Sequence, residues 1–232
     1  MKKSLSLFLA LTLFIVISAI LVLNTDELIY NVFSNSVDQK KTIIIDPGHG
    51  GFDGGAVASD GTPEKDINLE ISKTLKCFLT HFGFDVVMTR DTDISTESAS
   101  EKKNKKTSDL YNRLALMKEQ EDAIYVSIHL NKFTSSSVCG AQTFYSQNAD
   151  GSDVLAQSIH SNIINMLQPE NTREIKKGTK SIFLLKNATC PTVIVECGFL
   201  SNNEELIKLK DENYQRMMAF CIFCGIMDYH MV

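Results

Sequence analysis

The sequence predicts an α/β fold with a single central mixed, largely parallel sheet of about six strands, flanked by helices on both faces. Short apolar runs rich in β-branched residues alternate along the chain with longer segments whose apolar residues recur at helical spacing. The runs are apolar at consecutive positions, as expected of strands that helices cover on both sides. With 232 residues and no internal repeat, the chain is long enough for one substantial domain and a terminal segment.

Six short runs are the predicted strands, and five longer segments are the predicted helices. The strands are residues 43–45, 84–89, 123–128, 140–145, 182–185 and 192–195. The first helix begins with Thr62 as N-cap and Pro63 at the first helical position, and it ends at Gly83. The other helices are expected around residues 110–117, 155–163, 203–209 and 213–228, and the last should bury Met217, Cys221 and Cys224.

The amino terminus has the pattern of an export signal. Lys2 and Lys3 precede residues 4–23, which carry no charge and are numerous enough to cross a bilayer. We interpret residues 1–24 as a signal peptide or membrane anchor, residues 25–40 as a linker, and residues 41–232 as the catalytic domain. No clear small-residue cleavage site ends the apolar run, so an uncleaved anchor is favoured. The domain is therefore expected to be exported and extracytoplasmic, either membrane-anchored or secreted.

Charge and cysteine content narrow the class of protein. A net charge of −5 gives no reason to expect nucleic acid as a partner. Six cysteines in an exported chain would suggest disulfides, but Cys77, Cys197, Cys221 and Cys224 lie in apolar periodic segments. We expect these four to be small core residues. The C-x-x-C pattern of residues 221–224 falls in a helical segment, which argues against a redox role.

Two of the predicted strands end at a histidine. His49 follows the first strand in a loop of five glycines, and His129 follows the third strand. If these strands are parallel neighbours, both imidazoles face one crevice at the carboxyl edge of the sheet. Glu64 lies in the first turn of the helix after the glycine loop, where the helix dipole favours its ionised form. His49, Glu64 and His129 make the three-ligand set with an open position that catalytic zinc requires.

A further carboxylate ends the last predicted strand. Glu196 follows the apolar run 193–195, so it is a buried charge unless it has a partner. A zinc-bound water is a suitable partner for a general base at this position. The alternative for Glu196 is a structural salt bridge at the sheet edge.

Several segments together carry a resemblance to a known family. IDPGHGG at 45–51, Glu64, SIHLN at 127–131 and VIVECGFLSN at 193–202 resemble the zinc-dependent N-acetylmuramoyl-L-alanine amidases of the amidase 3 type, in the same order and spacing. NKKTSDLYNRL at 104–114, GAQTFYS at 140–146 and NTREIKKGTKSIFLLKN at 171–187 are similar to the germination-specific, spore-cortex branch found in endospore formers. The resemblance implies His49, Glu64 and His129 as zinc ligands and Glu196 as the catalytic carboxylate. Cys197 departs from the family pattern, and packing is favoured over a stray metal ligand there.

The resemblance implies hydrolysis of the amide between N-acetylmuramic acid and L-alanine in peptidoglycan. In spore cortex this cleavage would be the first step toward muramic-δ-lactam. Asn131 is a weaker candidate for a hydrogen bond to substrate or intermediate. The alternatives are a zinc peptidase that cleaves within the stem peptide, and a membrane-tethered peptidoglycan-binding module; the retained Glu196 argues against the second.

Regulation is the last expectation. Relatives in Gram-negative bacteria carry an occluding helix after the second histidine strand, and residues 131–139 leave no room for one. Because the loop around His49 is rich in glycine, the ligands could be poorly ordered until a partner braces them. We therefore expect an extracytoplasmic, membrane-attached activator protein that raises zinc affinity.

Overall fold

The computed structural model describes residues 42–96, 104–120 and 122–231. One compact unit spans Lys40–Val232. The predicted signal peptide or anchor at residues 1–24 and the predicted linker at 25–40 lie outside the described residues. None of the helices in the described ranges combines the length and the apolar character needed to span a membrane.

The core of the unit is one six-stranded sheet with the order β2-β1-β3-β6-β4-β5. Its strands are β1 (Thr42–Pro47), β2 (Asp85–Met88), β3 (Ile124–Asn131), β4 (Gln142–Tyr145), β5 (Lys176–Lys177) and β6 (Thr192–Phe199). Strands β2, β1, β3 and β6 are parallel, whereas β4 pairs with β6 in the antiparallel direction. The predicted mixed, largely parallel sheet is confirmed.

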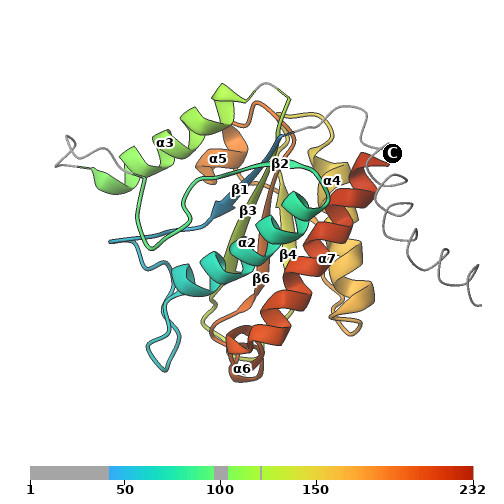
Figure 1. Ribbon diagram of the computed structural model, residues 1–232. Helices are drawn as coiled ribbons and strands as arrows, with labels where there is room; N and C mark the ends of the chain where they lie inside the picture. The colour runs from blue at the N-terminus through green and yellow to red at the C-terminus, as the bar shows by residue number, and fades with distance from the viewer. Residues whose placement is uncertain (1–41, 97–103, 121, 232) are drawn as a thin grey trace, which may run out of the picture. The chain divides into compact units, whose positions relative to one another are not determined.

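Helices cover both faces of the sheet, as predicted (Figure 1). Helices α2 (Glu64–His81), α4 (Ser152–Met166) and α7 (Glu212–His230) pack on one face, and α3 (Lys105–Glu119) and α5 (Phe183–Lys186) pack on the other. The short helix α6 (Asn203–Lys210) follows β6 and joins the first group. Because side chains alternate along a strand, Ile43 and Ile45 enter the larger core under α2, and Ile44 enters the smaller core under α3.

Several local predictions were wrong. Residues 182–185 are mostly helical, in α5, because a four-residue apolar run does not distinguish a strand from a helix turn. The two-residue edge strand β5 was missed, since its lysines carry no apolar signal. Helix α2 begins at Glu64, so Pro63 rather than Thr62 occupies the N-cap position.

The burial predictions for Met217 and Cys77 were also wrong. Met217 is 41% exposed and its neighbour Met218 is buried, so the buried side of α7 begins one residue later than expected. Cys77 is exposed because the buried stripe of α2 runs through Ile71, Leu75 and Leu79. Cys197 and Cys221 are buried as expected, and all six cysteines are free thiols.

Candidate active site

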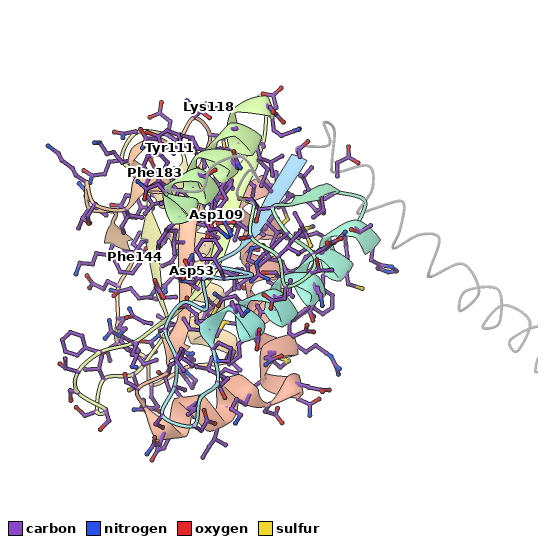
Figure 2. The ribbon with its side chains drawn as sticks, turned by 90° about the vertical axis from the view of Figure 1, so that its left-hand side faces the viewer. Asp53, Asp109, Tyr111, Lys118, Phe144 and Phe183 are labelled. Carbon is purple, nitrogen blue, oxygen red and sulfur yellow. The ribbon has the colours of Figure 1, made fainter. Side chains whose placement is uncertain are left out.

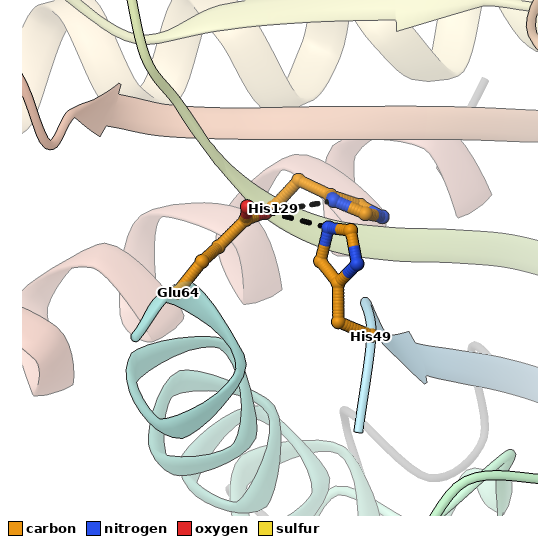
Figure 3. A group of neighbouring side chains, drawn as sticks. All are labelled: His49, Glu64 and His129. Carbon is orange, nitrogen blue, oxygen red and sulfur yellow. Dashed lines mark hydrogen bonds and ion pairs between the residues drawn. The ribbon is translucent and has the colours of Figure 1, made fainter. Parts of the chain in front are cut away.

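The parallel arrangement of β1 and β3 brings the two histidines together at the carboxyl edge of the sheet. His49 follows β1 by two residues, His129 lies near the end of β3, and Glu64 is the first residue of α2. Figure 3 shows the three side chains pointing toward one another. His129 Nδ1 lies 2.9 Å from Glu64 Oε1, and His49 Nε2 lies 3.3 Å from Glu64 Oε2. One donor atom from each residue lies within 4.8 Å of the other two.

Glu64 is held ionised at the centre of this group. Its side chain is only 3% exposed, and its oxygens accept hydrogen bonds from the amides of Ala56, at 2.8 Å, and Leu130, at 3.0 Å. Burial raises the pKa of Glu64, but the hydrogen bonds and charges of His129 and His49 outweigh burial, so the pKa lies well below its ordinary value. The group therefore presents a carboxylate and two imidazoles, which is a donor set that zinc accepts.

The position of His49 depends on an unusual backbone conformation and on Asp53. His49 has a φ of +63°, in the left-handed region that residues other than glycine seldom adopt. Asp53 Oδ2 lies 2.9 Å from His49 Nδ1, on the ring edge away from Glu64. A carboxylate on the second ring nitrogen fixes the tautomer and orientation of a metal-ligating imidazole. Asp53 therefore leaves Nε2 of His49 directed at the centre of the cluster.

Two glycines leave the space that the three side chains occupy. A Cβ atom on Gly48 would lie 2.3 Å from the ring of His129. A Cβ atom on Gly55 would lie 2.6 Å from both Glu64 Oε2 and the ring of His49. The glycine content of the loop thus has a packing reason, because the backbone approaches all three polar side chains closely.

Glu196 lies next to this group on β6. In the sheet register it is paired with His129 of β3, and partners in register point to the same face. Its Oε2 atom is buried and has no hydrogen-bond partner among the described residues. Burial raises the pKa of Glu196 to about 7, so this carboxyl is poised to gain or lose a proton near neutral pH. The predicted alternative, a structural salt bridge, is not present in the described residues.

Two other residues singled out in the sequence, Asn131 and Cys197, lie near the site on β3 and β6. Asn131 is the last residue of β3, two positions after His129, and pairs with Phe199. Cys197 is fully buried in the core between the sheet and the larger group of helices. Because Cys197 points to the opposite face from Glu196, packing explains this thiol. No helix forms between Asn131 and Gln142, so nothing in this segment resembles an occluding helix.

Two buried arginines, which sequence reasoning missed, hold the loop that carries His49. Arg90 donates to the carbonyls of Pro47, at 3.0 Å, and Gly48, at 3.1 Å. Arg113 of α3 donates to the carbonyl of His49 at 2.7 Å. Three consecutive carbonyls are thus bound from within the fold, and the looseness expected of a glycine-rich loop is not seen at these peptide groups.

Arg113 also forms a buried ion pair with Asp46 of β1. Burial raises the pKa of Asp46, but Arg113, Ser127 and Thr89 outweigh burial and lower it to about 2. Because the folded-state pKa is depressed, the ionised Asp46 stabilises the fold at neutral pH, and this contribution disappears as the pH falls from about 4 toward 2.

We expect Arg113→Met to destabilise the protein strongly. The substitution leaves the buried carboxylate of Asp46 without its charge partner, and breaking such a pair costs about 3–5 kcal/mol. Urea unfolding of the full-length protein measures the loss. The double variant Arg113→Met/Asp46→Asn should recover part of it, because the unpaired charge of Asp46 is removed, while Asp109 still lacks its partner. Lys118→Met, on the exposed side of the same helix, is the matched control and should change stability by less than about 0.5 kcal/mol. Equal stabilities of Arg113→Met and Lys118→Met would contradict the prediction.

A pocket of about 620 Å³ is lined by residues just before β4, by the segment after α4 and by residues of α6 and α7. Its lining includes Gly140, Gln168, Arg173, Glu205 and Tyr214, and none of the five residues predicted from the sequence. The candidate site at the carboxyl edge of the sheet is therefore not part of this pocket.

Comparisons with known proteins agree with this arrangement. Residues 43–228 match the protein family described as N-acetylmuramoyl-L-alanine amidase. The germination-specific N-acetylmuramoyl-L-alanine amidase of Bacillus subtilis is 38% identical over 191 residues, which cover 82% of this chain and 79% of that protein.

Two solved structures are similar as well. The CwlD amidase from Clostridioides difficile, determined in complex with the GerS lipoprotein, has a TM-score of 0.78 and 40% identity, covering 82% of this chain and 98% of that chain. An N-acetylmuramoyl-L-alanine amidase from Clostridium difficile 630 has a TM-score of 0.71 and 32% identity. The match covers 82% of this chain and 96% of that chain. The chain described here therefore belongs to the N-acetylmuramoyl-L-alanine amidases, a family of hydrolases that act on peptidoglycan.

Proposed function

We propose that this amidase is a zinc enzyme, with His49, Glu64 and His129 as metal ligands and Glu196 as the catalytic carboxylate. The observation that carries the proposal is the convergence of three donor groups beside a buried carboxylate oxygen without a partner. The reaction is hydrolysis of the amide between the lactyl group of N-acetylmuramic acid and the L-alanine of the stem peptide.

The donor group fits zinc in number and type. One nitrogen from each imidazole and one oxygen of Glu64 lie within 4.8 Å of one another, close enough to hold a single ion. Three protein ligands leave the fourth position to water or substrate, as in catalytic rather than structural sites.

The residues around this position supply the remaining chemistry. The chemistry that zinc supplies when bound is a lowered pKa of water and polarisation of the scissile carbonyl. Glu196 accepts the proton of the attacking water at its unpartnered oxygen and passes it to the nitrogen of the departing L-alanine. Asn131, at the end of β3, can donate a hydrogen bond to the substrate or the intermediate.

We propose spore cortex as the substrate and the first step toward muramic-δ-lactam as the role. The similarity to the germination-specific amidase of Bacillus subtilis supports this assignment. Closure of the lactam ring would then be left to a separate deacetylase. The enzyme would act outside the cytoplasm, attached to the membrane through residues 1–24 or released from it.

Product analysis tests the proposed reaction. Full-length protein is incubated with cortex fragments, with and without a chelator, and the products are identified by mass spectrometry. Free L-alanine amino termini together with peptide-free muramic acid, formed only without chelator, are expected. New termini within the stem peptide would instead identify a zinc peptidase, and cleavage that persists with chelator would refute the zinc requirement.

We also propose a membrane-attached, extracytoplasmic lipoprotein as an activating partner. The similar CwlD amidase was determined in complex with the GerS lipoprotein, which supports a partner of this class. Since Arg90 and Arg113 already brace the loop of His49, its glycine content does not supply the reason for the partner. Tight stoichiometric zinc and full activity of the purified protein alone would rule out the dependence.

A further inference from the structure

A row of polar side chains extends from the candidate site across the sheet. His129 of β3 is paired with Glu196 of β6, and Glu196 is paired with Gln142 of β4. Residues paired in register share a face, so the three side chains lie on the same side of the sheet. Because neighbouring strands are about 4.8 Å apart, Gln142 lies about 10 Å from His129 in this row.

A second row lies directly behind the first. Ile194 of β6 is paired with Phe144 of β4, and Phe144 is paired with Lys176 of β5. Phe144 is half-buried, and neither Phe144 nor Ile194 belongs to the two apolar cores under the helices. Figure 2 views the molecule from the side of α3 and shows Phe144 below Phe183 of α5. The strip next to Glu196 is thus apolar, with Ile194 only 8% exposed, Phe144 half-buried and Lys176 exposed at its far edge.

The side chain of Arg173 lies next to Gln142, at the end of the polar row, and three contacts hold it in place. Its Nη1 donates to Gln142 Oε1 and its Nε to the carbonyl of Cys139, both at 2.9 Å. Its guanidinium lies 4.7 Å from the ring centre of Phe199. Gln142 is itself held, because its Nε2 donates to the carbonyl of Glu174 at 2.9 Å.

The guanidinium of Arg173 has capacity for a ligand. It forms no ion pair with any carboxylate in the described part of the chain, and two of its five N–H groups are used in the hydrogen bonds above. It also lines the pocket of about 620 Å³, so part of it borders free space. The acidic Glu205 in that pocket is occupied by the amides of Gly140 and Phe199.

We propose that Arg173 and Lys176 bind carboxylates of the peptidoglycan stem peptide, which lies over Phe144 and Ile194 as it leaves Glu196. This inference rests on the proposed function and assigns the peptide side of the substrate to β4 and β5. The stem peptide has carboxylates on the residues after L-alanine, whereas the glycan chain next to the scissile bond is uncharged. An extended peptide advances about 3.3–3.6 Å per residue, so its second and third residues reach the distance of β4 and β5 from the site. Arginine is well suited to this role because its planar fork matches a carboxylate.

The experiment compares two disaccharide–tripeptide fragments that differ only in a carboxylate or a carboxamide at the second residue. Arg173→Gln in the full-length protein should raise KM for the carboxylate fragment about tenfold or more, with kcat nearly unchanged, because a hydrogen bond to a charged group is lost. KM for the carboxamide fragment should change less than about twofold. Lys176→Ala should raise KM for both fragments about two- to threefold, because the carboxylate that reaches β5 belongs to the third residue, which the fragments share, and because the side chain of Lys176 is exposed.

Lys177→Ala is the matched control. Lys177 follows Lys176 in β5 and is paired with Tyr145, so its side chain points to the opposite face of the sheet with the same charge. It should leave KM for both fragments unchanged. An effect of Lys177→Ala equal to that of Lys176→Ala would reduce the role to general electrostatics and overturn the proposal.

A binding measurement separates this inference from the proposed reaction. The tripeptide product is titrated into wild-type protein and Arg173→Gln by calorimetry, with no turnover required. Weaker binding by Arg173→Gln supports the subsite even if the wild type cleaves a different bond. Equal binding, or equal losses on both fragments, would assign Arg173 to the fold alone and overturn the proposal, while hydrolysis by the wild type would leave the proposed function intact.

Discussion

We expect His49→Ala and His129→Ala each to lose zinc and amidase activity together. Each substitution leaves two protein ligands in place of three, and a two-ligand site does not hold zinc at ordinary concentrations. Activity should fall by more than about 10³-fold, because the water that attacks the amide keeps a pKa of about 15.7 instead of about 7. Metal analysis of the purified full-length variants and the rate of muramoyl-alanine cleavage are the two measurements.

The control for this pair is His81→Ala. His81 is the last residue of α2, is exposed, and lies at the opposite end of that helix from Glu64. It should retain one zinc per chain and normal activity, which shows that loss of a histidine is not in itself harmful. Stoichiometric zinc in both His49→Ala and His129→Ala would remove them from the ligand set.

The sequence predicted the candidate site because its residues sit at the ends of readable elements. The apolar runs before His49 and His129 have the pattern of buried strands, and parallel strands bring such ends to one edge of a sheet. Glu64 begins α2, which the helical spacing of Ile67, Ile71 and Leu75 had indicated. Local pattern and chain direction together were sufficient to place these three side chains near one another.

The supporting residues could not be predicted, because their contacts are distant along the chain. Arg90 reaches the carbonyl of Gly48 across 42 residues, and Arg113 reaches that of His49 across 64. In the sequence each arginine looks like an ordinary charged residue at a strand end or in a helix. Only their burial in the structure shows that these arginines support the site. A buried guanidinium requires several hydrogen-bond acceptors, and here it takes them from the backbone of the loop.

The partly covered apolar strip of the sheet beside Glu196 was also beyond sequence reasoning. Phe144 and Ile194 read as ordinary core positions of two strands, because an apolar strand residue gives no sign of whether a helix covers it. The coverage of a face depends on which helices pack on it, and the four-residue helix α5 on this face was expected to be a strand.

Glu196→Gln should keep zinc but lose most of the activity. Glutamine has the same shape as glutamate, so the packing at this position, opposite His129 in the sheet, is preserved, but the amide cannot accept the proton of the attacking water. We expect turnover to fall by a factor of about 10² to 10⁴, the usual contribution of a general base. The absence of a partner for Glu196 Oε2 means that no structural hydrogen bond to that atom is lost, so stability should be unchanged or slightly increased.

The combination of readouts distinguishes this role from that of a metal ligand. We expect one zinc per chain in Glu196→Gln and less than one in the histidine variants. Glu119→Gln, at the exposed end of α3, is the control for the change in charge. Adding Glu196→Gln to His129→Ala should cause little further loss of activity, because groups that act as a unit in one step are not additive. A near-normal rate in the single variant would mean that the proton leaves by another route. Loss of zinc from it would place Glu196 among the ligands and require a different general base.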